Sequence, residues 1–258
     1  MSADPAAKPG RSQPKPPVFR SVGQAYADAR AALSAMPDML LVGLVLSCVY
    51  AAADIALGWL FDSKAGFSMP AFLLSTLTGQ AWNFALTPVF IAIHRYIILN
   101  EVTERYRLDT REPRFIAFFG WTVILTLAGS VPVLLGRQAG AGTLAGTLVM
   151  AVMLFVFVIS VRLIILFPAI AVDAPGRQWQ NAYADSRGSF WRILGIEIVA
   201  LLPLLVVALL AVAALGEESG VLKAVLTVAA FFGAVLSVAI ASRLYQALAL
   251  RLRGPAAI

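Results

Sequence analysis

The charged residues that stand in or beside long apolar segments are the first candidates for chemistry in this sequence. Arg95, Arg162 and Arg243 each lie near the end of such a segment. A guanidinium stays protonated and forms paired hydrogen bonds with phosphate or carboxylate oxygens, so three arginines in matching places could converge on one anionic site. Two other interpretations stay open: the three can extend their charges to the membrane interface or pair between helices, or Arg162 alone is functional.

Two carboxylates also interrupt apolar segments. Glu197 is the natural partner for Arg162 across a helix interface, because an unpaired charge inside a bilayer is costly. We prefer a structural ion pair to a proton relay for these two residues. Asp54 lies deeper in its segment, with Gln80 and Asn83 available on the next one. It is the candidate coupling-ion or proton site of a transporter, and otherwise a neutral or hydrogen-bonded carboxyl.

Most other site chemistry is excluded by what the sequence lacks. The single His94 cannot supply a metal site that needs two imidazoles, and the single Cys48 cannot form an intramolecular disulfide. We expect His94 at the membrane interface. The sequence contains no phosphate-cradling Gly-Lys-Ser/Thr loop, no nucleophile elbow and no metal cluster. It therefore predicts no enzyme, no cofactor and no metal.

The elements that position these residues follow from composition. Of 258 residues, 60% are hydrophobic and 13% are charged, and the mean hydropathy is +0.84. A soluble domain has about half its residues apolar and about a quarter charged. A membrane span needs roughly 20 mainly apolar residues. The segments that qualify are Met39–Phe61, Ala71–Ile93, Phe115–Leu135, Leu144–Ile170, Ile193–Leu215 and Val221–Leu244.

These segments predict an all-α membrane protein with about six transmembrane helices in a single domain, residues 18–250. Residues 1–17 are rich in proline and basic residues and predict a disordered tail, and residues 251–258 form a short second tail. The fourth segment is the longest, so we expect it to tilt or to project beyond the bilayer.

The Lys and Arg residues predict the orientation. Of the 20 in the sequence, only Lys64, Arg137 and Lys223 fall on one side of the predicted spans, and Arg162 falls within a span. Positive residues near span ends resist translocation, so both termini are predicted to be cytoplasmic. The basic face should attract anionic headgroups. Because topology accounts for the basic charge, nucleic-acid binding is not expected.

A short internal match indicates a repeat. Residues 24–30 (QAYADAR) recur at residues 181–187 (NAYADSR), each a short distance before an apolar segment. We predict three parallel units, at about 18–99, 100–173 and 174–250, each a cytoplasmic amphipathic helix followed by a transmembrane hairpin. The predicted apolar face of the first amphipathic helix comprises Phe19, Val22, Tyr26, Ala29, Leu33 and Met36.

One stretch resembles a known family. The run 161–173 (VRLIILFPAIAVD), continuing through Ala182, Ser186, Arg187-Gly188 and the run 190–195 (FWRILG), is similar to the segment shared by YciC-like proteins and the membrane domain of some glycerophosphodiester phosphodiesterases. The resemblance implies a multi-helix inner-membrane domain, sometimes found beside lipid-headgroup chemistry. The chain lacks the soluble phosphodiesterase domain, so hydrolase activity is not implied. The matching positions are Arg162, Pro168, Asp173, Ser186 and Trp191.

The sequence therefore predicts a non-enzymatic, multi-pass protein of the bacterial inner membrane. It would bind or organise anionic lipid, or a phosphate-bearing ligand, at its cytoplasmic side. The alternative is a small-solute or ion transporter or channel that uses Asp54 or the Arg162/Glu197 pair. Rows of small residues are compatible with a homo-oligomer or with a membrane-protein partner.

Overall fold

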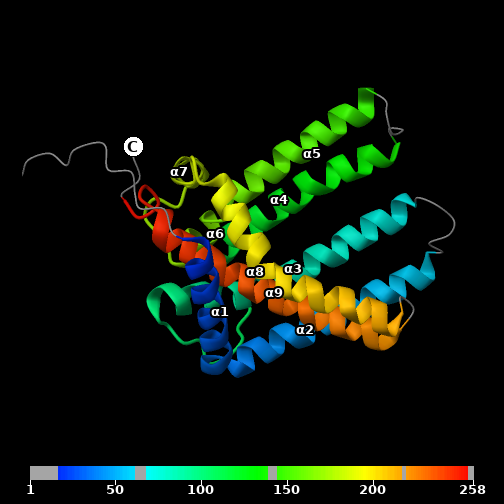
Figure 1. Ribbon diagram of the computed structural model, residues 1–258, viewed down its shortest axis with the longest axis horizontal. Helices are drawn as coiled ribbons and strands as arrows, with labels where there is room; N and C mark the ends of the chain where they lie inside the picture. Colours follow the sequence, from blue (N-terminus) through cyan, green and yellow to red (C-terminus); the bar gives the residue numbers. More distant parts are fainter. Residues whose placement is uncertain (1–16, 62–67, 139–143, 217–218, 255–258) are drawn as a thin grey trace, which may run out of the picture.

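The fold is a bundle of helices. The computed structural model describes residues 17–61, 68–138, 144–216 and 219–254, and every regular element in these ranges is an α-helix (Figure 1). The helices are α1 (Val18–Ala35), α2 (Pro37–Leu60), α3 (Met69–Leu99), α4 (Pro113–Gln138), α5 (Leu144–Leu163), α6 (Leu166–Ala171), α7 (Trp179–Asp185), α8 (Phe190–Leu215) and α9 (Gly220–Leu248). Six of them, α2, α3, α4, α5, α8 and α9, are long and apolar enough to cross a membrane. The prediction of an all-α chain with six helices that could span a membrane is confirmed.

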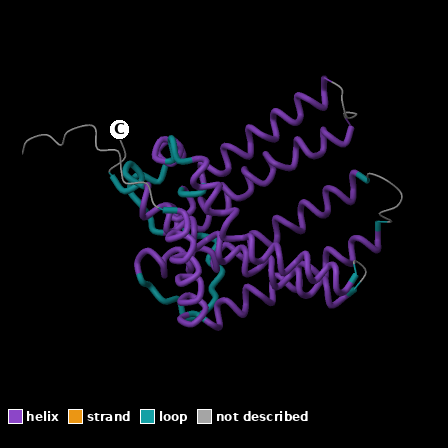
Figure 2. The backbone as a smooth tube through the Cα atoms, viewed as in Figure 1, coloured by secondary structure: helices purple, strands orange, loops and turns teal. Residues whose placement is uncertain are grey.

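The six long helices form three hairpins: α2 with α3, α4 with α5, and α8 with α9. In Figure 1 the hairpins spread apart at the end where α2, α4 and α8 finish, which we call the hairpin end. At the opposite end they converge, and α1, α6 and α7 lie there; this is the packed end. Figure 2 shows that most of the irregular described segments also gather at the packed end.

Buried residues concentrate at the packed end. They include residues 86–94 of α3, 235–248 of α9 in large part, and most of α6. By contrast, none of the 18-residue apolar window of α5 is buried, and only 6% of that of α8. Exposed apolar side chains on these spans suit a lipid solvent, in which they need no cover from protein.

Helix α1 packs against the bundle through its small residues. Its buried residues are Ser21, Ala25, Ala29 and Ala32, which contact α8 and α9. Phe19 and Tyr26, on the predicted apolar face, are 81% and 39% exposed. Small side chains allow two helices to approach closely, so the alanine row, rather than the bulky residues, faces the bundle. The predicted helix is formed, and its amphipathic role stays a prediction.

The fourth span is shorter than predicted. The segment expected to run unbroken over residues 144–170 divides into α5, which ends at Leu163, and α6, which begins at Leu166. Pro168 explains the break, because it has no N–H to donate to the carbonyl of Ile164, four residues earlier. Leu166, Ala169 and Ile170 in α6 are buried at the packed end, so this segment neither tilts across the bilayer nor projects from the bundle.

The predicted amphipathic helix of the second unit is not formed. Residues 100–112, before α4, contain no helix. The segment is rich in charges of both signs and has few apolar residues, so no helical face would be buried. It is fastened instead by Tyr106, whose hydroxyl donates to the carbonyl of Ala85 at 2.9 Å. The first and third hairpins do follow a short helix, α1 and α7, and the three-unit repeat stays a prediction.

Candidate functional site

The three arginines at the span ends have different surroundings. Arg243, on α9, forms an ion pair with Asp28 of α1, with 2.6 Å between Nη2 and Oδ1. The carboxylate is mostly buried, with its side chain 16% exposed. This pair neutralises Arg243 and ties α1 to the end of the last span.

Arg95, near the end of α3, belongs to a network of charges. Its Nε donates to Oε2 of Glu101 at 2.8 Å, and its Nη1 donates to the carbonyl of Ala171 at 3.0 Å. Asp173 also lies 3.7 Å from Nη1, and it accepts a hydrogen bond from Arg114 at 3.3 Å. The network holds α3, α4 and the segment after α6 together, so Arg95 is neutralised as well.

Arg162 differs from both. Its guanidinium lies over the ring of Tyr183, with 3.3 Å between Cζ and the ring centroid. It donates to the Oγ of Ser186 at 3.3 Å and to the backbone carbonyl of Tyr183. Within the part of the chain that the structure describes, no carboxylate forms an ion pair with Arg162. Its charge is oriented by neutral groups and is not neutralised.

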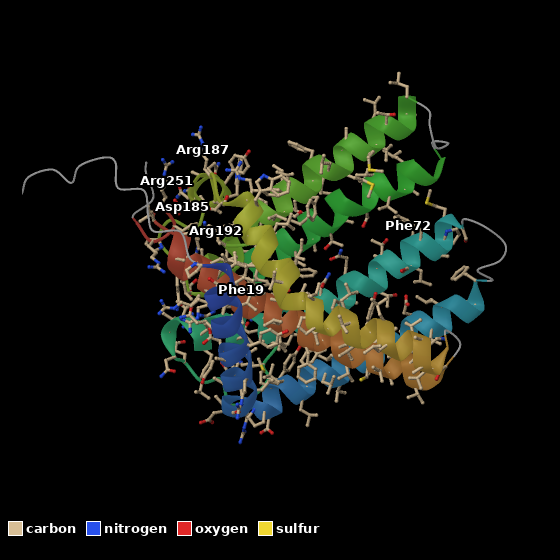
Figure 3. All side chains as sticks on the ribbon, viewed as in Figure 1. Phe19, Phe72, Asp185, Arg187, Arg192 and Arg251 are labelled. Carbon is tan, nitrogen blue, oxygen red and sulfur yellow. The ribbon has the colours of Figure 1, made fainter. Side chains whose placement is uncertain are left out.

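Arg162 lines a cavity with two more arginines. The cavity, about 420 Å³ in volume, is lined by Arg162, Tyr183, Ala184, Arg187 and Arg251, and we call it the arginine pocket. Neither Arg187 nor Arg251 forms an ion pair with another described residue. Figure 3 shows Arg187 and Arg251 close to Asp185 at the packed end. Three arginines in the lining give the cavity a positive charge, and guanidinium groups form paired hydrogen bonds with anions.

Asp185 holds Arg251 in place through the backbone. Its carboxylate accepts from the N–H groups of Leu250, Arg251 and Leu252, at 3.0, 2.9 and 3.1 Å. Burial raises the pKa of Asp185 above its ordinary value, while these donors and the Arg251 charge act in the opposite direction. Gly176 donates its N–H to the carbonyl of Leu252 at 3.1 Å, which fastens the same turn.

Sequence reasoning missed the arginine pocket, although one signal was present. Asp28 and Asp185 occupy the same position of the repeated heptapeptide. Both bind the C-terminal end of α9 or the turn that follows it, Asp28 through Arg243 and Asp185 through backbone N–H groups. A shared role for the two aspartates would have indicated that residues 250–252 lie beside α7.

The predicted Arg162–Glu197 ion pair is not formed. Glu197 accepts a hydrogen bond from the Oγ of Ser237 on α9 at 3.2 Å, and its other oxygen is buried with no hydrogen-bond partner in the described residues. Arg162 is directed to α7 instead, because Tyr183 and Ser186 lie beside the end of α5. The two residues therefore do not form one site.

Asp54 lies in a different environment from the predicted one. It is exposed and lines a cavity between α2 and α9, whose lining includes neither Gln80 nor Asn83. Both polar atoms of the Gln80 amide are buried without a hydrogen-bond partner among the described residues. Across the cavity from α2, the lining includes Lys223 on α9.

His94 is buried rather than interfacial, and its Nδ1 lies 2.8 Å from the Oγ of Ser242. Aromatic and apolar residues of α3, α4 and α9 surround it, so it packs the core. Across the described residues, no three His, Cys, Asp or Glu side chains are grouped so that they could hold a metal ion.

No protein-family model matches this chain, and no curated protein or solved structure is detectably similar to it. The residues that carry the resemblance to YciC-like proteins nevertheless lie close together in part. Arg162 and Ser186 are hydrogen bonded, Asp173 accepts from Arg114 and Arg177, and Trp191 is 80% exposed. Family membership stays a prediction.

Proposed function

We propose that this chain is a non-enzymatic integral membrane protein that binds a phosphate-bearing group in the arginine pocket, and that this group is the headgroup of an anionic lipid. The observation that carries the proposal is the grouping of Arg162, Arg187 and Arg251 around one cavity with no carboxylate in its lining. Arginine presents a planar fork of donors that matches phosphate oxygens. Tyr183 fixes the plane of one fork before a ligand arrives.

The position of the pocket supports a lipid ligand. Aromatic side chains are exposed at the same end of the molecule, among them Phe19, Trp179 and Trp191. Exposed aromatic rings at a span end are typical of the membrane interface, where lipid headgroups lie. The bias of Lys and Arg favours the cytoplasmic leaflet of a bacterial inner membrane for this end.

The arginines predicted as one site thus acquire separate roles. Arg95 and Arg243 are committed to Glu101, Asp173 and Asp28, so we assign them to holding the packed end together. Arg162 keeps its predicted ligand role, in company with Arg187 and Arg251.

Lipid retention tests the proposal. Protein extracted in mild detergent is analysed by native mass spectrometry, with the triple variant Arg162→Gln/Arg187→Gln/Arg251→Gln beside the wild type. We expect the wild type to retain phosphatidylglycerol or cardiolipin and the variant to lose at least about tenfold in affinity, the loss of one or two charge-assisted hydrogen bonds.

A second triple variant controls for net charge. Arg20, Arg30 and Arg111 are exposed, form no ion pair with another described residue and lie outside the pocket. Their replacement by Gln removes the same charge and should leave retention unchanged. Equal losses in both triple variants would show diffuse attraction to the membrane surface and would reject the pocket. Competition by inorganic phosphate or glycerol phosphate distinguishes a soluble ligand from a lipid.

One observation favours the alternative, a small-solute or ion transporter or channel: Asp54 lines a cavity within the spans. Flux of labelled cations and amino-group solutes into vesicles that contain the purified protein tests it directly. Flux abolished by Asp54→Asn would support transport, and no protein-dependent flux would count against it.

A further inference from the structure

A second cavity lies between α2, α3 and α9, far from the arginine pocket along the chain and in the bundle. It has a volume of about 510 Å³, within the roughly 300–1,000 Å³ of small-molecule sites. Asp54, near the end of α2, and Lys223, in the first turn of α9, line it toward the hairpin end. Ser47, Trp82 and Phe231 come from the middle of their helices. The cavity therefore extends from a charged mouth to an aromatic interior, and we call it the α2/α9 cavity.

The two charged groups at the mouth have opposite signs but are not joined. No ion pair links Asp54 to Lys223, and neither side chain pairs with another charged residue in the described ranges. Charges beside an apolar wall are costly to leave without partners. A ligand with a single positive charge would be attracted by Asp54 and repelled by Lys223, and a ligand with a single negative charge would be attracted by Lys223 and repelled by Asp54. A ligand with one positive and one negative group can pair with both side chains at the same time.

The aromatic residues favour an ammonium as the positive part of that ligand. The rings of Tyr50 and Trp82 are stacked, with 5.1 Å between centroids and 24° between planes. Trp82 is held by a hydrogen bond from its Nε1 to the Oγ of Ser47 at 3.3 Å. Tyr50 and Asp54 lie four residues apart on α2, so a ring and a carboxylate face the same space one turn apart. A fixed aromatic face beside a carboxylate attracts an alkylammonium.

The remaining lining is apolar except for Thr227, whose hydroxyl donates to the backbone carbonyl of Lys223. Ile55 and Gly58 on α2, with Leu226 and Ala230 on α9, complete the wall between the charged mouth and the aromatic residues. Such a wall accommodates methylene groups and would not solvate a second polar head.

We propose that the α2/α9 cavity binds a zwitterion in which an ammonium and a phosphate are separated by a short carbon linker, the chemistry of phosphoethanolamine. The ammonium contacts Asp54 and the face of Tyr50 that is not stacked on Trp82, and the phosphate contacts Lys223. The same group occurs in the headgroup of a phospholipid and in a soluble metabolite. The proposal is independent of the arginine pocket, whose residues it does not share.

Binding in bilayer discs of defined composition tests the proposal. Wild-type protein is placed in phosphatidylglycerol discs that contain a minor fraction of phosphatidylethanolamine, and the lipid retained after transfer to detergent is measured by native mass spectrometry. We expect enrichment of phosphatidylethanolamine over phosphatidylglycerol, reduced at least tenfold by Asp54→Asn and by Lys223→Gln. The free compound, O-phosphoethanolamine, is titrated into discs of phosphatidylglycerol alone.

Two variants make the result specific. Asp38→Asn removes an exposed carboxylate from the first turn of the same helix, outside the cavity, and should leave enrichment unchanged. The exchange variant Asp54→Lys/Lys223→Asp keeps both signs at the mouth and should recover binding relative to either single variant. Thermal unfolding of each variant identifies any that has lost its fold.

Enrichment of the lipid without binding of O-phosphoethanolamine identifies a lipid headgroup, and binding of the free compound identifies a soluble zwitterion. Absence of binding for both, or binding that Asp54→Asn leaves intact in a folded protein, overturns the proposal. The loss caused by Asp54→Asn or Lys223→Gln, measured against the wild type, does not depend on whether the arginine pocket retains an anionic lipid.

Discussion

The two ends of the bundle are stabilised in different ways. At the packed end, ion pairs, backbone hydrogen bonds and buried side chains join α1, α3, α6, α7 and α9. At the hairpin end, the described helices meet mainly within each hairpin, and their apolar side chains are exposed (Figure 1). The packed end therefore depends on contacts inside the protein, whereas the exposed apolar side chains of the hairpin end suit a lipid surround. Contacts fix the relative positions of the helices at the packed end, and the hairpin end has a cavity for a ligand between α2 and α9.

The largest expected effect comes from removing the same side chain at the two ends. Leu244, on α9 at the packed end, is 2% exposed, and Leu210, on α8 toward the hairpin end, is 64% exposed. Leu244→Ala should lower the free energy of unfolding by about 2 kcal/mol, because it leaves a cavity. Leu210→Ala should change it by less than about 0.5 kcal/mol. Reversible unfolding in mixed micelles measures both, and equal losses would contradict the difference between the ends.

The next effect concerns the ion pair that fastens α1. Asp28→Asn leaves the partly buried Arg243 without its carboxylate, and we expect a loss of about 2 kcal/mol in the free energy of unfolding. Glu104→Gln, an exposed carboxylate without an ion-pair partner among the described residues, is the matched control. Protease cleavage within residues 18–35 should also become faster in Asp28→Asn. Unchanged cleavage would mean that the alanine row alone holds the helix.

A smaller effect, on anionic-lipid affinity, is expected from Tyr183, whose ring orients the Arg162 guanidinium in the arginine pocket. Tyr183→Leu removes the ring beneath Arg162 and keeps the backbone carbonyl that the arginine contacts. A cation–π contact contributes about 0.5–1 kcal/mol at an exposed site, so anionic-lipid affinity should fall a few-fold. Tyr183→Phe retains the ring and should bind as the wild type does. A loss in Tyr183→Phe equal to that in Tyr183→Leu would assign the effect to the hydroxyl.

The smallest effect is a pH dependence at Asp185. Because the folded protein raises the pKa of this carboxyl, the folded state binds the proton more tightly than the unfolded state. The contribution of Asp185 to stability is therefore fully present below its ordinary pKa of about 4 and decreases as pH rises through the higher folded value. Asn mimics the protonated carboxyl, so the stability of the wild type should fall relative to that of Asp185→Asn as pH rises across this range. A wild type that gained stability relative to Asp185→Asn with rising pH would reverse the assignment.

The spans could be predicted from sequence because hydropathy depends on composition along the chain. Each long helix agrees with its predicted segment to within a few residues at most ends, and the exceptions have local causes. Pro168 divides the fourth segment, and α3 extends beyond Ile93 to Leu99, where Asn100 ends it in a left-handed conformation with φ of 57°. A proline at that position was visible in the sequence, but whether it kinks or ends a helix depends on what packs beside it.

The site could be predicted only in part, because side-chain partners depend on packing between distant helices. Arg162 was identified as a candidate, but its contacts, Tyr183 and Ser186, come from a helix whose position the sequence pattern does not specify. Arg243 meets a carboxylate 215 residues earlier in the chain. The hydrophobic pattern of α1 identified its apolar face but not the face that packs against the bundle. That face consists of Ser21 and three alanines, whose small side chains allow close approach.

The attachment of α1 also has a consequence for biosynthesis. The first helix of the chain is held by Asp28 to α9, and the Tyr26 hydroxyl donates to the carbonyl of Ala200 on α8 at 2.7 Å. A ribosome completes both partners last, at about 5–20 residues per second, so α1 must wait for most of translation before its binding face exists. A chain interrupted before α9 would leave Asp28 without Arg243 and would leave uncovered the part of α1 that packs on α9.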